Sequence, residues 1–115
     1  MRIAREILET AMLLSGMEDA ESVFLGEADF YRKGLYLVNQ ALSEIGVERV
    51  ENLDSPVSLT AEQADAVHYA AARMIAVLLH NSEAVEVLSG LYDQKRAKAF
   101  SQSGQRINRI PTAYR

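Results

Sequence analysis

Residues 60–79 read TAEQADAVHYAAARMIAVLL, and this segment carries the strongest helical pattern in the chain. Thr60 followed by Gln63 predicts a capping box, in which each side chain binds a free backbone amide of the other residue. The run YAAARMIAVLL is apolar almost all round apart from Arg73, so we expect a central helix with neighbours on several sides. One face repeats at helical spacing and consists of Ala64, Val67, Ala71, Ile75 and Leu78.

Three further helical segments surround this one. The first runs from about Arg2 to Ser15 and is ended by Gly16. The second runs from Asp29, a plausible N-cap, to about Ile45, and it carries an apolar stripe. The last runs from about Glu83 to Phe100, after a break at Asn81 and Ser82. Strand signals are weak, so the chain is predicted to be all-α.

Two residues of the second helix invite specific interpretations. Gly34 costs up to about 1 kcal/mol relative to Ala inside a helix. It marks either a close helix crossing or an irregular first turn. Asn39 lies beside the apolar stripe, and it is either an exposed polar side chain or a tie between this helix and a loop backbone.

Length and composition fit one small domain. The chain has 115 residues, 49% of them hydrophobic, and no cysteine. We predict a small bundle of about four helices over residues 1–100, followed by an extended C-terminal docking tail over residues 101–115. The first 16 residues lack the apolar core of a signal peptide, and no stretch approaches the roughly 20 apolar residues that span a membrane.

No catalytic, cofactor-binding or metal-binding pattern stands out. The sequence contains no phosphate-binding glycine loop, no HExxH and no GxSxG. His68 and His80 are about 18 Å apart if they lie on one helix, which is too far to share a metal ion. We interpret both as structural. Tyr31, Tyr36, Tyr69 and Tyr92 are interpreted as aromatic residues at the edge of the core.

The charge is divided unevenly along the chain. All 16 acidic residues and six of the 12 basic residues lie in residues 1–93, while residues 94–115 hold the other six basic residues and no acid. The net charge is therefore −10 in the first part and +6 in the second, which gives the −4 of the whole chain. Opposite signs on body and tail indicate that the tail meets an acidic surface, on a neighbouring copy, another protein or nucleic acid.

The tail is either a disordered terminus or a segment that orders on a partner. Its apolar residues are not needed by a solvated tail, its arginines suit carboxylates, and its proline lowers the entropy lost on docking. The predicted docking residues are Arg106, Ile107, Asn108, Arg109, Ile110, Pro111 and Tyr114. A possible secondary basic contact is formed by Lys95, Arg96 and Lys98.

Several of these segments together resemble the head-completion, or head–tail connector (adaptor), proteins of tailed bacteriophages and prophages. The similar features are LYLVNQALSEIG at residues 35–46, the alanine-rich third helix, and LYDQKR at residues 91–96. The linker from Val50 to Leu59 also follows the pattern I/V-x-x-L-x-S/D-x-V/I-x-L, and Ile110-Pro111 near the C-terminus is similar as well.

The resemblance implies a structural subunit without catalysis or cofactor. Such proteins form a homo-oligomeric ring of about twelve copies that binds the portal protein and the next neck or tail-completion protein. The ring extends the channel through which genomic DNA passes without sequence-specific binding. The implied location is the neck of the virion, after synthesis in the bacterial host cytoplasm, with no membrane partner.

Two other interpretations remain open. One is a different neck or tail-completion protein of the same machinery. The other is a small helical DNA-binding or regulatory domain that uses its basic C-terminus. A DNA-binding protein should lose affinity steeply as salt increases, whereas a connector should bind the portal ring instead.

Overall fold

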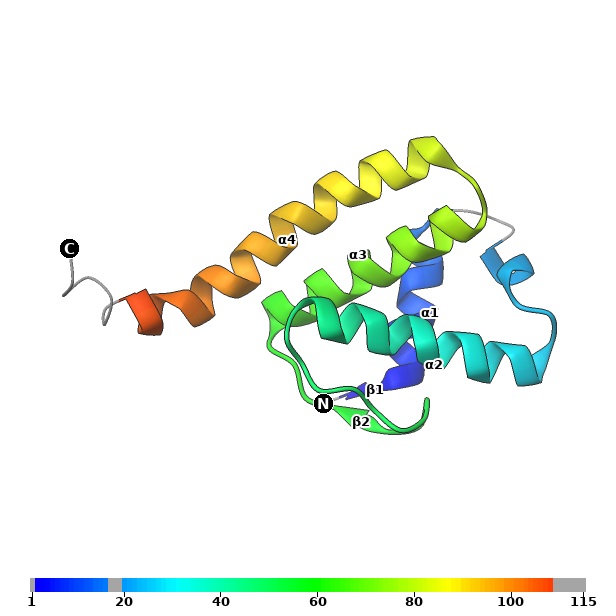
Figure 1. Cartoon of the computed structure of the whole chain (residues 1–115), viewed down its shortest axis with the longest axis horizontal. Helices are drawn as coiled ribbons and strands as arrows, with labels where there is room; N and C mark the ends of the chain where they lie inside the picture. The colour runs from blue at the N-terminus through cyan, green and yellow to red at the C-terminus, as the bar shows by residue number, and fades with distance from the viewer. Residues whose placement is uncertain (1, 17–19, 109–115) are drawn as a thin grey trace.

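The computed structural model describes residues 2–16 and 20–108, with residues 2, 20, 21 and 101–108 described by their backbone alone. Within these residues the chain forms four α-helices, one short 3₁₀ turn and two very short strands (Figure 1). The predicted all-α class with about four helices is therefore confirmed. In chain order the elements are β1 (Arg2–Ile3), α1 (Ala4–Leu14), η1 (Ala20–Val23), α2 (Glu27–Glu44), β2 (Pro56–Val57), α3 (Ala61–Leu78) and α4 (Ser82–Asn108).

Helix α3 occupies the middle of the bundle. It contacts α1, α2 and α4, and Figure 1 shows α4 on one side of it with α1 and α2 on the other. The capping box is present, because the Thr60 hydroxyl accepts from the Gln63 amide at 3.1 Å and the Gln63 side chain accepts from the Thr60 amide at 3.0 Å. Ala71 and Ile75 are fully buried. The predicted central helix is thus confirmed.

Helices α1 and α2 cross closely at Gly34. A Cβ atom at this position would lie 2.5 Å from Cδ2 of Leu8 and 3.5 Å from Cδ1 of Leu53. Glycine is therefore needed for the approach of the two helices, and of the two interpretations of Gly34 the close crossing is correct.

The segment between α2 and α3 is held by the N-terminal strand and by α2. Strands β1 and β2 pair antiparallel, with Arg2 opposite Val57 and Ile3 opposite Pro56. Farther back along the chain, the Asn39 side chain exchanges two hydrogen bonds with the backbone of Val50. The interpretation of Asn39 as a tie between helix and loop is thereby confirmed.

The predicted starts of the first two helices differ from the structure. Helix α1 begins at Ala4, because Arg2 and Ile3 pair as a strand instead. Helix α2 begins two residues before Asp29, after Gly26, whose φ of 122° is a conformation that glycine adopts readily. Asp29 therefore does not cap the helix, although its carboxylate accepts from the Leu25 amide at 2.9 Å.

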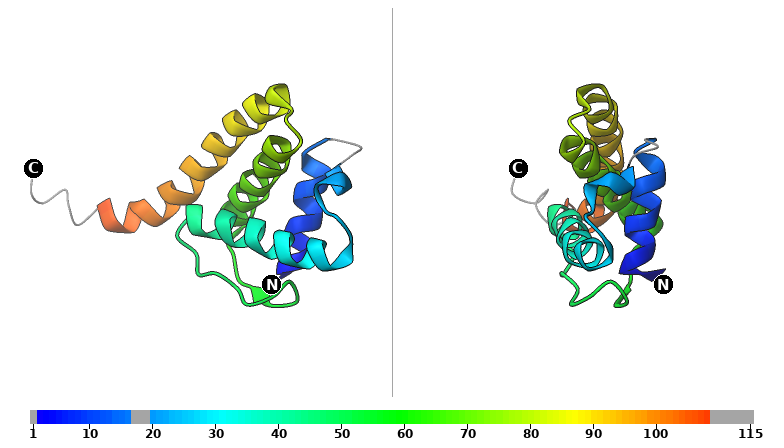
Figure 2. Two further views of the ribbon diagram at one scale, coloured as in Figure 1. Left: turned by 45° about the vertical axis from the view of Figure 1, so that its right-hand side comes forward. Right: turned by 90° about the vertical axis from the view of Figure 1, so that its right-hand side faces the viewer.

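Helix α4 is longer than predicted. It begins where expected, since the Asn81 side chain accepts from the Ala84 amide at 3.0 Å, but its backbone continues to Asn108 rather than ending near Phe100. One glycine in a helix costs about 1 kcal/mol, so Gly104 does not stop it. The final turns of α4 extend beyond the rest of the bundle, as Figure 1 and the left view of Figure 2 show.

Candidate functional site

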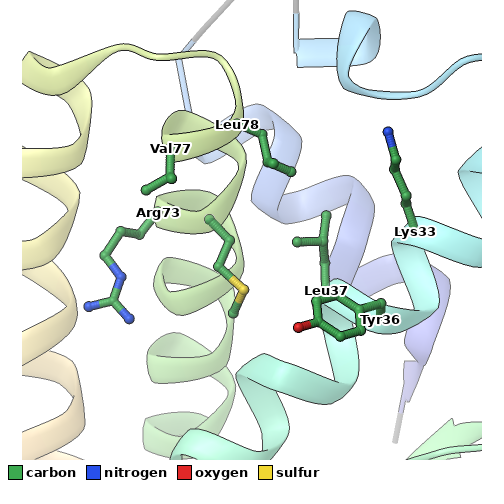
Figure 3. A pocket seen from close by; sticks show the side chains of 7 residues that line it. Lys33, Tyr36, Leu37, Arg73, Val77 and Leu78 are labelled. Carbon is green, nitrogen blue, oxygen red and sulfur yellow. The ribbon is translucent and has the colours of Figure 1, made fainter.

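An open apolar groove lies between α2 and α3. Its volume is about 500 Å³, and Figure 3 shows the side chains that line it on the two helices, with Arg73 pointing toward α4. The exposed fractions are 62% for Tyr36, 52% for Val77 and 48% for Leu78, which is high for large apolar side chains. These side chains make the groove a candidate surface for contact with another molecule. The groove is lined by Lys33, Tyr36, Leu37, Arg73, Met74, Val77 and Leu78.

Both cations at the groove are already paired with carboxylates. Lys33 lies 3.3 Å from the Asp29 carboxylate and also donates to the Val23 carbonyl at 3.1 Å. Arg73 donates to the Glu44 carboxylate at 2.9 Å. The rim therefore presents little free charge, and the groove suits an apolar ligand better than an anion.

Arg73 also connects the groove to α4. Its guanidinium lies 4.6 Å from the centre of the Tyr92 ring, a favourable cation–π distance. Tyr92 is only 3% exposed. Burial raises the pKa of Tyr92 to about 12, and the nearby Glu44 carboxylate acts in the same direction. The arginine is thus held by α2 and α4 together, which fixes one edge of the groove.

Asp29 organises the start of α2. The Leu25 amide that donates to its carboxylate is the largest influence and lowers the pKa of Asp29 below its ordinary value. Burial acts in the opposite direction, while Arg32 at 3.0 Å and Lys33 lower the pKa further. The charged carboxylate therefore positions Lys33 beside the groove.

The three basic residues of the predicted secondary contact lie on α4 but do not form one free patch. Lys95 is 3.7 Å from the Asp65 carboxylate of α3. Arg96 stacks 4.7 Å from the centre of the Phe100 ring, and that ring is 41% exposed. Lys98 is exposed. Two of the three thus contact other side chains of the protein, and Arg96 and Lys98 are exposed to solvent.

The predicted docking residues lie at or beyond the end of α4. Arg106, Ile107 and Asn108 belong to its last turns by their backbone. The remainder of the predicted set lies outside the described residues and consists of Arg109, Ile110, Pro111 and Tyr114. The role of this segment in docking therefore stays a prediction.

Two structural features are absent from the described part of the chain. Among those residues, no group of three or more His, Asp or Glu side chains is arranged to hold a metal ion. Over the same residues, no helix combines the length and the apolar character needed to cross a membrane. His68 is buried on α3, as a structural histidine would be. His80 lies in the turn that follows α3, and its φ is 57°.

Comparison with known proteins finds no matching family model, no matching curated protein and no matching solved structure. The resemblance to phage connector proteins accordingly stays a proposal.

The groove is the feature that the sequence did not reveal. Leu78 fits the helical spacing of the buried face, and it was expected there, yet it is half-exposed and lines the groove. Tyr36 was expected at the core edge and is mostly exposed. The available signal was the unusually apolar end of α3, but a sequence does not show that α2 and α4 leave one side of that end uncovered.

Proposed function

We propose that this protein is a structural subunit of a phage or prophage neck, which forms a ring that joins the portal to the tail and extends the DNA channel. In this proposal the chain performs no catalysis and needs no cofactor. Its partners are the portal protein, neighbouring copies of itself and the next neck or tail-completion protein.

The observation that best supports the proposal is the projection of α4 from the bundle. This helix has 27 residues, or about 40 Å, whereas the central α3 has 18. The end of α4 lies beyond the other helices (Figure 1), and Lys98 and Phe100 in the later part of this helix are exposed. A ring requires two different patches on each subunit, one that reaches out and one that receives. The projecting end of α4 and the α2–α3 groove are two such patches.

The test is co-sedimentation of the full chain with the portal ring of the same phage or prophage. We expect the native chain to sediment with the ring and the Arg109→Glu variant to bind at least ten times more weakly. Arg49→Glu makes the same charge change on an exposed loop residue and should bind normally. If the native chain stays in the supernatant at all concentrations, the connector proposal is wrong.

A second candidate function is a small DNA-binding or regulatory domain. It is favoured by the acid-free end of the chain, where Arg96 and Lys98 point outward. Such a domain should bind duplex DNA with a log–log salt slope of about 0.9 per phosphate neutralised. A connector should show little affinity for DNA and no sequence preference. Titration of labelled DNA at two salt concentrations separates these functions.

A further inference from the structure

We propose that the α2–α3 groove of one copy binds the segment from Ile110 to Tyr114 of a neighbouring copy. This inference rests on the proposed ring, and it identifies the surface of each subunit that receives the tail of the next subunit. The occupant is a second copy of this chain, and the contact runs head to tail.

The chemistry of the groove matches that segment. The groove wall is apolar along Leu37, Met74, Val77 and Leu78, and its two cations are neutralised by Asp29 and Glu44. The segment offers two large apolar side chains, and it brings no acid that could use the rim cations. Apolar side chains that enter an apolar groove are removed from water, and this favours binding.

The spacing of the two large apolar residues within the segment also supports this contact. Ile110 and Tyr114 are four residues apart, so in an extended strand-like form they point to the same side. Their separation is then about 13 Å. Pro111 between them fixes its own φ and favours an extended backbone at Ile110, which reduces the entropy lost on binding.

The groove of the same chain is out of reach. Val77 lies beside Val85, since both line one small hollow where α3 turns into α4. From Val85 to Asn108 the helix rises about 35 Å. Beyond Asn108, Tyr114 can travel at most about 20 Å when fully extended. The tail of one copy therefore cannot enter the Val77 end of its own groove, and only another copy can supply it.

The test uses the absence of cysteine from the native chain, so that two introduced thiols are the only ones present. One copy carries Val77→Cys in the groove, and a second copy, made larger by a tag, carries Ala113→Cys in the tail. The two full-length copies are mixed under mild oxidation, at high concentration, with and without the portal ring. The control replaces the groove cysteine by Leu13→Cys on α1, which is 81% exposed.

We expect at least ten times more mixed disulfide with Val77→Cys than with Leu13→Cys. Leu78→Lys, added to the groove copy, should abolish this preference, while its circular dichroism spectrum stays native because the side chain is half-exposed. An equal yield from groove and control, both with and without the portal, would overturn the inference. So would an intramolecular disulfide in a dilute chain that carries both Val77→Cys and Ala113→Cys.

The inference and the proposed function can fail separately. Loss of the groove preference with normal portal sedimentation would overturn the tail-in-groove contact alone. A strong groove preference in a protein that never sediments with the portal would support the contact and refute the connector function.

Discussion

The side chain of Asn39 and the backbone of Val50 form two reciprocal hydrogen bonds. The Asn39 amide nitrogen donates to the Val50 carbonyl at 3.0 Å, and the Val50 amide donates to the Asn39 oxygen at 2.7 Å. An asparagine side chain thus takes the place that a backbone peptide group occupies in a sheet. Through this pair, α2 holds the start of the segment that leads to α3.

Replacing Asn39 by Ala should lower the free energy of unfolding by about 1–3 kcal/mol, because two partly buried backbone groups lose their partner. Urea denaturation measures the change. Gln40→Ala, one position along the same helix, removes only an exposed contact with the Tyr36 hydroxyl and should change stability by less than about 0.5 kcal/mol. Equal effects of the two substitutions would contradict the importance of this pair.

Ile75→Asp should destabilise the protein by at least about 3 kcal/mol, since it places an unpaired charge at a fully buried position of α3. Ala71→Arg, also at a fully buried position, should act similarly. Val77→Asp on the same helix is the matched control, because Val77 is 52% exposed and should tolerate the charge. Thermal unfolding compares the three variants, and native melting of Ile75→Asp would refute the central position of α3.

Gly34→Ala and Gly90→Ala should change the free energy of unfolding in opposite directions. At Gly34 the added methyl group meets buried Leu8, and such overpacking costs about 1–3 kcal/mol, which outweighs the gain in helix propensity. At Gly90 nothing lies within 4 Å, so alanine should stabilise α4 by about 0.5–1 kcal/mol. Guanidinium denaturation measures both. A stabilising Gly34→Ala would show that α1 and α2 separate at little cost.

Stability should decrease in alkali partly through Tyr92. Its pKa is about 12 in the folded protein and 10.0 as the ordinary value, so the folded state disfavours the phenolate. The stabilisation from the neutral hydroxyl is complete below pH 10 and is lost as pH rises toward 12. Tyr92→Phe should therefore lose less stability than the native protein between pH 10 and 12.

The matched control for that experiment is Tyr36→Phe, because Tyr36 is mostly exposed. This variant also removes a phenolic hydroxyl, so it separates the effect of a buried hydroxyl from that of an exposed one. The decisive quantity is the difference in unfolding free energy between each variant and the native protein across pH 10–12. A constant difference for Tyr92→Phe would show that the hydroxyl is not disfavoured in its charged form.

Local signals allowed the helices to be predicted, and long-range packing accounts for what was missed. The Thr60–Gln63 capping box and the Asn81 cap involve residues close in sequence, so a pattern reveals them. The strand at Ile3 forms only by pairing with Pro56, which is far away in the sequence. The residues around Ile3 do not reveal which segment that partner is. The exposure of Leu78 likewise depends on the positions of α2 and α4, and the apolar periodicity of the sequence does not reveal those positions.

The candidate site was predicted only in part. The projecting basic end of the chain was visible in its charge, but the stacking of Arg96 on Phe100 and the pairing of Lys95 with Asp65 required the fold. The groove had no sequence signal of its own, since a side chain such as Val77 looks the same in a core as on an open surface.

The contact between the N-terminal residues and the segment before α3 has a consequence for the order of folding. The Ala4 amide donates to the Ser55 carbonyl at 3.0 Å, and the Arg5 amide donates to the Leu53 carbonyl at 2.8 Å. The first turn of α1 therefore has its free amides bound by residues that a ribosome makes much later. During synthesis this helix must remain frayed at its start until the later segment emerges. Closing so large a loop is slow compared with forming a helix, so the first helix in the sequence should be among the last to become stable.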